Sequence, residues 1–195
     1  MAKSFLNQSG YPVGFRNNNP GNLRPGVVPW MGQIGVSNNF CQFKDMSWGL
    51  RAMALDLSNK ITKDGLNTIT AIITKYAPPS ENDTQSYINL VSQYTGWGAS
   101  DIIDFNSDSL LTLMRAQMNV EDGKKYADLL SDADILEGIS LMPESIFSRV
   151  KDFFANNPGI AAVAGLGISA VAIYIIILLV RHKKVNLQSF KNVFK

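Results

Sequence analysis

The carboxylates of this chain are the side chains that we consider first for catalysis. The sequence has a single Cys and a single His, which excludes a disulfide within the chain, a zinc site built on Cys and His, and a His-based nucleophile pair. Acid–base chemistry would therefore come from Asp or Glu. A catalytic carboxylate needs partial burial, because burial raises its pKa toward the working pH. We therefore searched for an acid on an apolar helical face.

Glu121 fits that description. It continues a stripe of Leu110, Met114 and Met118 at helical spacing, and Gly123 follows at once. The spacing predicts a helix that ends near Gly123 and presents the Glu121 carboxylate to a cleft. The alternative is that Glu121 is a solvated acid at a frayed helix end.

Glu81 is the second candidate, either as a partner carboxylate or as a cleft residue. It stands just before a predicted helix, where the positive end of the helix dipole favours an acid without any catalytic role. Polar turn residues could in turn hydrogen-bond a polar ligand: Asn18, Asn19, Asn22 and Arg24. Asn-rich turns also form without a ligand.

The elements that would position these residues are mainly helices. Asn, Pro and Gly dominate residues 11–45, so we expect loops and short irregular strands there. Apolar periodicity and capping residues predict helices over 46–60, 69–76, 83–94, 108–120 and 132–139. For 69–76 the expected cap is Asn67, and for 83–94 it is Asn82 or Asp83. The predicted fold class is a mainly α, α+β globule with a small irregular β and loop lobe, plus one C-terminal transmembrane helix.

The charge of the chain is unevenly distributed. Residues 1–158 carry 13 basic and 16 acidic residues, a net charge of −3, which excludes a strongly basic nucleic-acid-binding head. Residues 159–180 hold no charge and are long enough to cross a bilayer as a helix. The last 15 residues, 181–195, carry five basic residues and no acid. We expect domains at 1–142 and 159–180, an amphipathic linker at 143–158 and a basic tail at 181–195.

This organisation predicts a single-pass protein with a C-terminal anchor and a lipid bilayer as partner. The positive-inside rule keeps a basic tail in the cytoplasm, which would require the head to cross the bilayer. A membrane inside a virus particle resolves the conflict, with the tail contacting nucleic acid non-specifically. A bacterial inner membrane is the alternative location. Small residues every four positions, at Ala161, Gly165 and Ser169, would allow helix–helix self-association.

Residues 15–140 resemble the phage lysozyme-like domains that carry the motif NNPGN-[LI]-R and occur in virion-associated peptidoglycan-degrading proteins. The motif stands here at Asn18–Arg24, and further blocks follow in order at 49–54, 76–88, 121–123 and 134–139. The resemblance implies a lysozyme or lytic-transglycosylase fold that cleaves the MurNAc–GlcNAc bond of peptidoglycan without a cofactor or a metal. Other virion proteins would be further partners.

Related glucosaminidases place their catalytic Glu before the Asn-Asn block, whereas here no Glu precedes it. We therefore interpret the arrangement as circularly permuted, with Glu121 as the general acid. One well-placed acid favours a lytic transglycosylase over a muramidase. In that reaction Tyr76 and Tyr87 would line the substrate-binding cleft, although helix-face aromatic residues are more often part of a core. Two other functions stay open: a catalytically inactive structural virion or membrane protein that keeps the fold, and a bacterial accessory protein that thins the wall locally.

Overall fold

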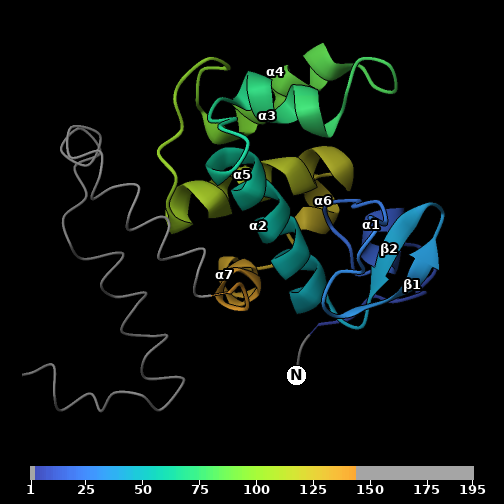
Figure 1. Cartoon of the computed structure of the whole chain (residues 1–195). Helices are drawn as coiled ribbons and strands as arrows, with labels where there is room; N and C mark the ends of the chain where they lie inside the picture. The colour runs from blue at the N-terminus through green and yellow to red at the C-terminus, as the bar shows by residue number, and fades with distance from the viewer. Residues whose placement is uncertain (1–2, 144–195) are drawn as a thin grey trace, which may run out of the picture. The chain divides into compact units, whose positions relative to one another are not determined.

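The helix α2 (Met46–Thr62) is the element against which most of the described chain is arranged. The computed structural model describes residues 3–143, which belong to one compact unit spanning Met1–Lys151. The other helices and strands of the described chain are α1 (Val13–Arg16), β1 (Gln33–Ser37), β2 (Phe40–Phe43), α3 (Ile69–Tyr76), α4 (Thr84–Thr95), α5 (Ser107–Glu121), α6 (Lys124–Ala127) and α7 (Asp132–Ser140). Figure 1 shows α3 and α4 on one side of α2, α5 crossing behind α2, and the two strands on another side.

The five helices predicted from periodicity all form, to within a few residues of the expected ends. Each begins at a residue whose side chain accepts a backbone N–H of the first turn, as capping residues do. Asp83 caps α4 and Asn106 caps α5. The predicted cap of α3 was wrong by one position, because Thr68 rather than Asn67 accepts the amide of Ala71. The sequence patterns did not indicate α1 and α6, since helices of four residues are too short to show periodicity.

The Asn- and Gly-rich segment forms a small lobe, as predicted. Strands β1 and β2 make an antiparallel hairpin with an irregularity in the register between Gln33 and Gly35. Its turn consists of Asn38 and Asn39, both with positive φ (51° and 66°), a conformation that Asn tolerates better than most residues. The lobe packs on α2 through a buried cluster of Leu23, Cys41, Phe43 and Ala52.

The loop at Asn17–Leu23 is fixed between the hairpin and α2. The amide of Cys41 donates to the carbonyl of Leu23 at 2.8 Å, and the amide of Phe43 donates to the carbonyl of Asn17 at 2.9 Å. On the other side, a β-carbon built on Gly49 of α2 would lie 1.8 Å from the Asn18 carbonyl oxygen. Only glycine therefore allows the loop to approach the helix this closely.

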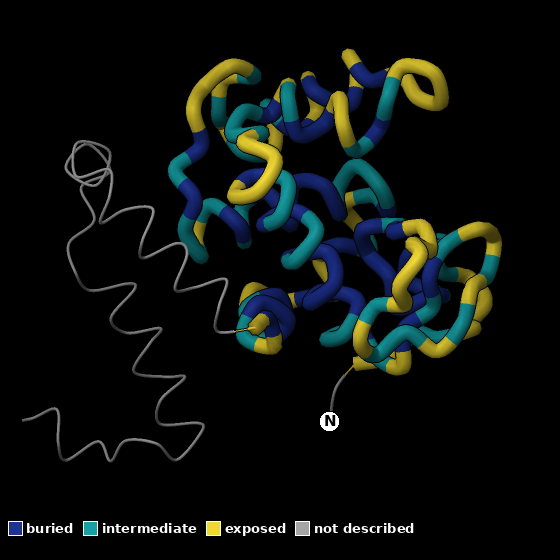
Figure 2. Tube along the Cα trace, viewed as in Figure 1, coloured by how far each residue is buried: buried dark blue, intermediate teal, exposed yellow. Residues whose placement is uncertain are grey.

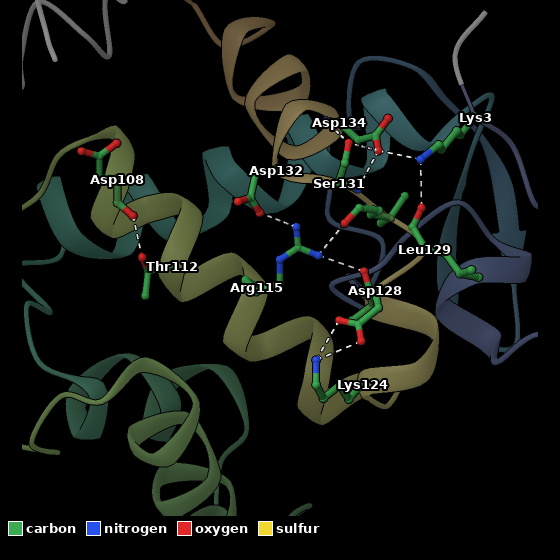
Figure 3. A network of polar contacts seen from close by, with 12 residues as sticks. Lys3, Asp108, Thr112, Arg115, Lys124, Asp128, Leu129, Ser131, Asp132 and Asp134 are labelled. Carbon is green, nitrogen blue, oxygen red and sulfur yellow. Dashed lines mark hydrogen bonds and ion pairs between the residues drawn. The ribbon is translucent and has the colours of Figure 1, made fainter.

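The helix α5 crosses the core and is held near its C-terminal end by Arg115 (Figure 3). The Arg115 guanidinium donates to the carbonyls of Ala127 (2.9 Å) and Leu130 (2.5 Å) and pairs with Asp132 at 2.5 Å. These contacts tie α5 to α6 and to the first residue of α7. Figure 2 shows the buried residues running through the centre of the described chain, where α2 and α5 contribute Leu50, Leu57, Leu113 and Met114.

The fold class predicted from the sequence needs a correction. Among residues 3–143, no helix combines the length and the apolar character needed to cross a bilayer. The predicted transmembrane helix 159–180, the basic tail 181–195 and all but the first residue of the linker 143–158 lie outside the described residues. Residues 3–143 therefore form a mainly helical domain with one two-stranded sheet, and none of the helices described there meets the requirements of a membrane span.

Candidate active site

Glu121 is the last residue of α5, and both of its carboxylate oxygens accept a hydrogen bond from a neutral side chain. The hydroxyl of Tyr87 on α4 donates to Oε1 at 2.6 Å, and the Nδ2 amide of Asn22 donates to Oε2 at 2.7 Å. The helix ends here as predicted, because Asp122 is its C-cap and Gly123 has a φ of 83°. Glu121 is half-buried. It is thus a positioned acid rather than a freely solvated one.

Three segments that are distant in the sequence meet at this carboxylate. Asn22 belongs to the small-lobe loop and lies 99 positions from Glu121 along the chain. Its φ of 46° places it in the left-handed region, which Asn adopts more readily than most residues. The asparagine block and the end of α5 are therefore adjacent in space, as the permuted arrangement requires.

Two tyrosines support the site from α3 and α4. The rings of Tyr76 and Tyr87 lie 6.1 Å apart in an edge-to-face arrangement. The Tyr76 hydroxyl donates to the carbonyl of Gly21, next to Asn22. Burial raises the pKa of both phenols well above the usual value, and the charge of Glu121 raises them further. Both hydroxyls therefore keep their protons, so each remains able to donate a hydrogen bond at neutral pH.

Glu121 opens on a cleft of about 290 Å³ between the small lobe and the helices. Five of the eight predicted site residues line it, namely Glu121, Glu81, Asn22, Arg24 and Tyr76. Tyr87 does not line the cleft; it is 8% exposed and reaches the site only through its hydroxyl. The remaining lining residues are Leu23, Trp30, Phe40, Asp56, Lys60, Lys75, Ala77 and Asn82.

Glu81 has different surroundings from Glu121 in the same cleft. Its carboxylate pairs with Arg24 at 2.9 Å, and both side chains are largely exposed. The backbone of the preceding turn holds Glu81 in place through its amide, which donates to the carbonyl of Pro78. The neighbouring Asp83 caps α4, and hydrogen bonds from Ser86 lower the pKa of its carboxyl. Asp83 is therefore a structural residue.

Asn18 and Asn19 lie in the scaffold and not in the cleft, which corrects their prediction as substrate-binding residues. Both are fully buried. The Asn18 side chain accepts the amide of Phe5 and donates to the carbonyl of Phe43. The Asn19 side chain bonds both the amide and the carbonyl of Leu23 and also the carbonyl of Cys41. Their polar groups are consumed in holding the loop that presents Asn22.

Asp122, beside Glu121, is a buried carboxyl with an unusual environment. It is 6% exposed, and neither of its side-chain oxygens forms a hydrogen bond of normal geometry with a described residue. A β-carbon on Gly14 would lie 2.3 Å from its Oδ1, so the backbone at Gly14 packs directly on it. Burial, with a further contribution from Glu121, raises the pKa of Asp122 to about 8, against a smaller lowering by the Gly14 backbone.

Sequence reasoning missed several residues of the cleft. Asp56 and Lys60 of α2 form an ion pair at 2.5 Å, and Trp30 and Lys75 complete the lining. Asp56 follows Ala52 and precedes Lys60 at spacings of four, and no motif in the sequence marks it as a cleft residue. Within residues 3–143, no group of three or more His, Cys, Asp or Glu side chains is arranged to hold a metal ion.

The fold and the cleft define a small, mainly helical domain with a positioned acid at a helix end. No model of a known protein family matches the chain. It is 35% identical over 115 residues to Protein P5 of Pseudoalteromonas phage PM2, and this match covers 56% of the chain and 71% of the phage protein. The chain therefore belongs to the family of this phage protein.

Proposed function

We propose that this protein is a peptidoglycan-degrading enzyme that cleaves the MurNAc–GlcNAc glycosidic bond with Glu121 as its catalytic acid. The observation that carries the proposal is the placement of Glu121. It is a carboxyl at a helix end, bonded by Asn22 and Tyr87, and it opens on a cleft that also contains Arg24 and Glu81. The motif NNPGNLR supplies Asn22 and Arg24, and its resemblance to phage lysozyme-like domains supports the same reaction.

In the proposed reaction, protonated Glu121 gives its proton to the glycosidic oxygen. The bond between that oxygen and C1 of the muramic acid then breaks, and C1 develops oxocarbenium character. The leaving sugar departs with the proton as a free hydroxyl, and Glu121 is left as a carboxylate. Asn22 and Tyr87 are bonded to the two oxygens of this carboxylate, so they stabilise the charge that forms.

The second half of the reaction favours a lytic transglycosylase over a muramidase. The other two carboxylates in the cleft are each held in an ion pair, Glu81 with Arg24 and Asp56 with Lys60. The 6-hydroxyl of the muramic acid can attack C1 and return its proton to Glu121, which forms a 1,6-anhydro ring and restores the acid. This route needs one carboxyl, no water nucleophile and no cofactor.

Tyr87 is suited to hold Glu121 through both protonation states. A hydroxyl can donate to a carboxylate and can accept from a carboxylic acid. When it accepts, its own proton needs another acceptor. Gln117 of α5 lies beside Tyr87 and is fully buried, and its amide atoms form no hydrogen bond with any other described residue. Its amide oxygen would accept the Tyr87 proton while Glu121 is neutral.

The relation to a phage protein supports a place for the enzyme in the virus particle. A wall-cleaving domain carried by the virion would open the host wall locally during infection, and other virion proteins would then be its partners. Antibodies against the chain should detect it in purified particles of the phage that encodes it. Absence from the particles, with the protein present in infected cells, would instead indicate a role in lysis.

The reaction is tested by incubating the full chain with purified peptidoglycan and identifying the released fragments by mass. We expect anhydro-muropeptides from the wild type and at least about a hundredfold less from Glu121→Gln, whose amide cannot deliver a proton. Fragments with a reducing end, 18 Da heavier for the added water, would show a muramidase instead. A folded wild-type protein that releases nothing would refute the enzymatic proposal and favour a structural role in the virion.

A further inference from the structure

The charged side chains of the cleft pair with one another, with two exceptions. Three cationic residues and three acidic residues line it: Arg24, Lys60, Lys75, Asp56, Glu81 and Glu121. Arg24 pairs with Glu81, and Lys60 pairs with Asp56. Glu121 is bonded by uncharged donors. Among residues 3–143, Lys75 is then the cation of the lining that has no acidic partner.

The lysine is exposed and lies in the last turn of α3, directly before Tyr76. Its ammonium group forms no hydrogen bond or ion pair with another residue in the part of the chain that the structure describes. Lys60 differs in this respect, because Asp56 at 2.5 Å neutralises it and its ammonium group also lies 5.5 Å from the Tyr76 ring centroid. An ammonium group without a protein partner is free to bind an anionic group of a ligand.

We propose that Lys75 is a specificity-determining residue that binds a carboxylate of the substrate strand while Glu121 acts on the glycosidic bond. This inference rests on the proposed function. In peptidoglycan, the muramic acid carries a lactyl group whose carboxyl is either free or extended by a peptide stem with carboxylates of its own. Both sources offer the same chemistry, an anion attached to the sugar whose bond is broken. A neutral N-acetylglucosamine polymer offers none.

Lys75 could also stabilise the protein because it lies at the end of a helix. The test must distinguish this effect on stability from an effect on substrate binding. A cation in the last turn of a helix interacts favourably with the helix dipole. Such an effect would change stability but would not depend on the charge of the substrate. Lys63 is a matched control, because it is an exposed lysine at the C-cap of α2 and is absent from the cleft lining.

The experiment measures cleavage by the full chain and by its Lys75→Gln, Lys75→Arg and Lys63→Gln variants. The substrates are glycan strands with intact peptide stems and strands stripped of their stems by an amidase, each with free carboxylates or with carboxylates amidated by carbodiimide. We expect Lys75→Gln to raise KM about fivefold on the charged strands with kcat unchanged, since an exposed ion pair is made equally in ground and transition state. Lys75→Arg should retain most of the wild-type KM.

The four substrates identify the anion. If Lys75→Gln raises KM only on the strands that carry peptide stems, Lys75 binds the stem carboxylates. If it raises KM on the stripped strands, Lys75 binds the lactyl carboxylate. An equal KM for wild type and Lys75→Gln on both charged substrates overturns the inference, as does an equal rise on the amidated substrates or in Lys63→Gln.

Binding provides a readout that does not depend on turnover. In the Glu121→Gln background, co-sedimentation with insoluble peptidoglycan should be weaker with the added Lys75→Gln substitution and unchanged with Lys63→Gln. Loss of turnover by the wild type with this binding difference intact would refute the proposed reaction and leave the role of Lys75 standing. Equal sedimentation of the Glu121→Gln protein with and without Lys75→Gln would refute the role of Lys75.

Discussion

Glu121 and Glu81 line the same cleft, but their surroundings differ in burial and in hydrogen-bond partners. Glu121 ends a well-packed helix, is half-buried and is bonded by a phenol and an amide. Glu81 lies in a turn, is largely exposed and pairs with the exposed guanidinium of Arg24. Two neutral donors hold the Glu121 carboxylate in one position, whereas an exposed ion pair holds Glu81 only weakly. The comparison shows why residue type alone does not select the proposed catalytic acid.

A second contrast lies within the asparagine block. Asn18 and Asn19 are fully buried and bond the backbone, whereas Asn22, a few residues later, points its amide at Glu121. One short motif therefore contains both the residues that shape the loop and the residue that the loop presents. The same residue type serves the scaffold or the site according to where the turn places it.

The largest effect is expected from comparing the two glutamates directly. Glu121→Gln should lower the rate of peptidoglycan cleavage by roughly 10²–10⁴-fold, the range for losing a general acid. Glu81→Gln should lower it by less than about tenfold, since an exposed ion pair contributes little. Solubilisation of labelled peptidoglycan measures both. If Glu81→Gln is the inactive variant and Glu121→Gln retains activity, the permuted arrangement is wrong.

The next largest effect separates the asparagines by stability. Asn19→Ala should lower the free energy of unfolding by about 2–4 kcal/mol, because it leaves buried backbone groups of Leu23 and Cys41 without their partner. Asn22→Ala should cost less, about 1–2 kcal/mol, and should act on catalysis as well. Urea denaturation followed by circular dichroism measures the difference. If the two variants lower the free energy of unfolding equally, Asn19 and Asn22 do not differ in their structural role.

The raised pKa of Asp122, the residue next to Glu121, predicts that the free energy of unfolding depends on pH. The pKa of its carboxyl is about 8 in the folded protein and 3.8 as the reference, so between these pH values the unfolded chain releases a proton that the folded protein keeps. The free energy of unfolding should therefore fall as pH rises through this window, by at most about 1.4 kcal/mol per unit.

The measurement is urea denaturation of the wild type and of Asp122→Asn at several pH values between 4 and 8. The Asn variant should lose this contribution and gain stability over the wild type as pH rises. Asp108→Asn, an exposed acid in the first turn of the same helix, serves as the control and should keep the wild-type slope. An identical slope in Asp122→Asn would show that Asp122 is not the group that titrates.

The smallest effect is expected at the exposed ion pair. Arg24→Gln should change the free energy of unfolding by less than about 1 kcal/mol, because solvent screens the pair with Glu81 and both side chains lose entropy when they form it. Thermal unfolding at low and high salt measures this contribution. A loss of several kcal/mol would mean that the Glu81 end of the cleft is as rigidly held as the Glu121 end.

Local patterns in the sequence determined the helices and much of the small lobe. Apolar spacing and capping residues such as Asp83 and Asn106 encode where α4 and α5 begin, since these interactions lie within a few residues of each other. The alignment of Glu121 with Leu110, Met114 and Met118 also came from spacing alone. Each of these features depends on one segment of the chain.

Only the tertiary structure decided which residues face the cleft. The contact between Asn22 and Glu121 joins positions 99 apart, and the burial of Asn18 and Asn19 depends on the approach of Gly49 in a different element. Asp56, Lys60 and Lys75 entered the site from α2 and α3 without a motif to mark them. Polar residues acquire their role from the groups that folding brings beside them, and no local pattern records those neighbours.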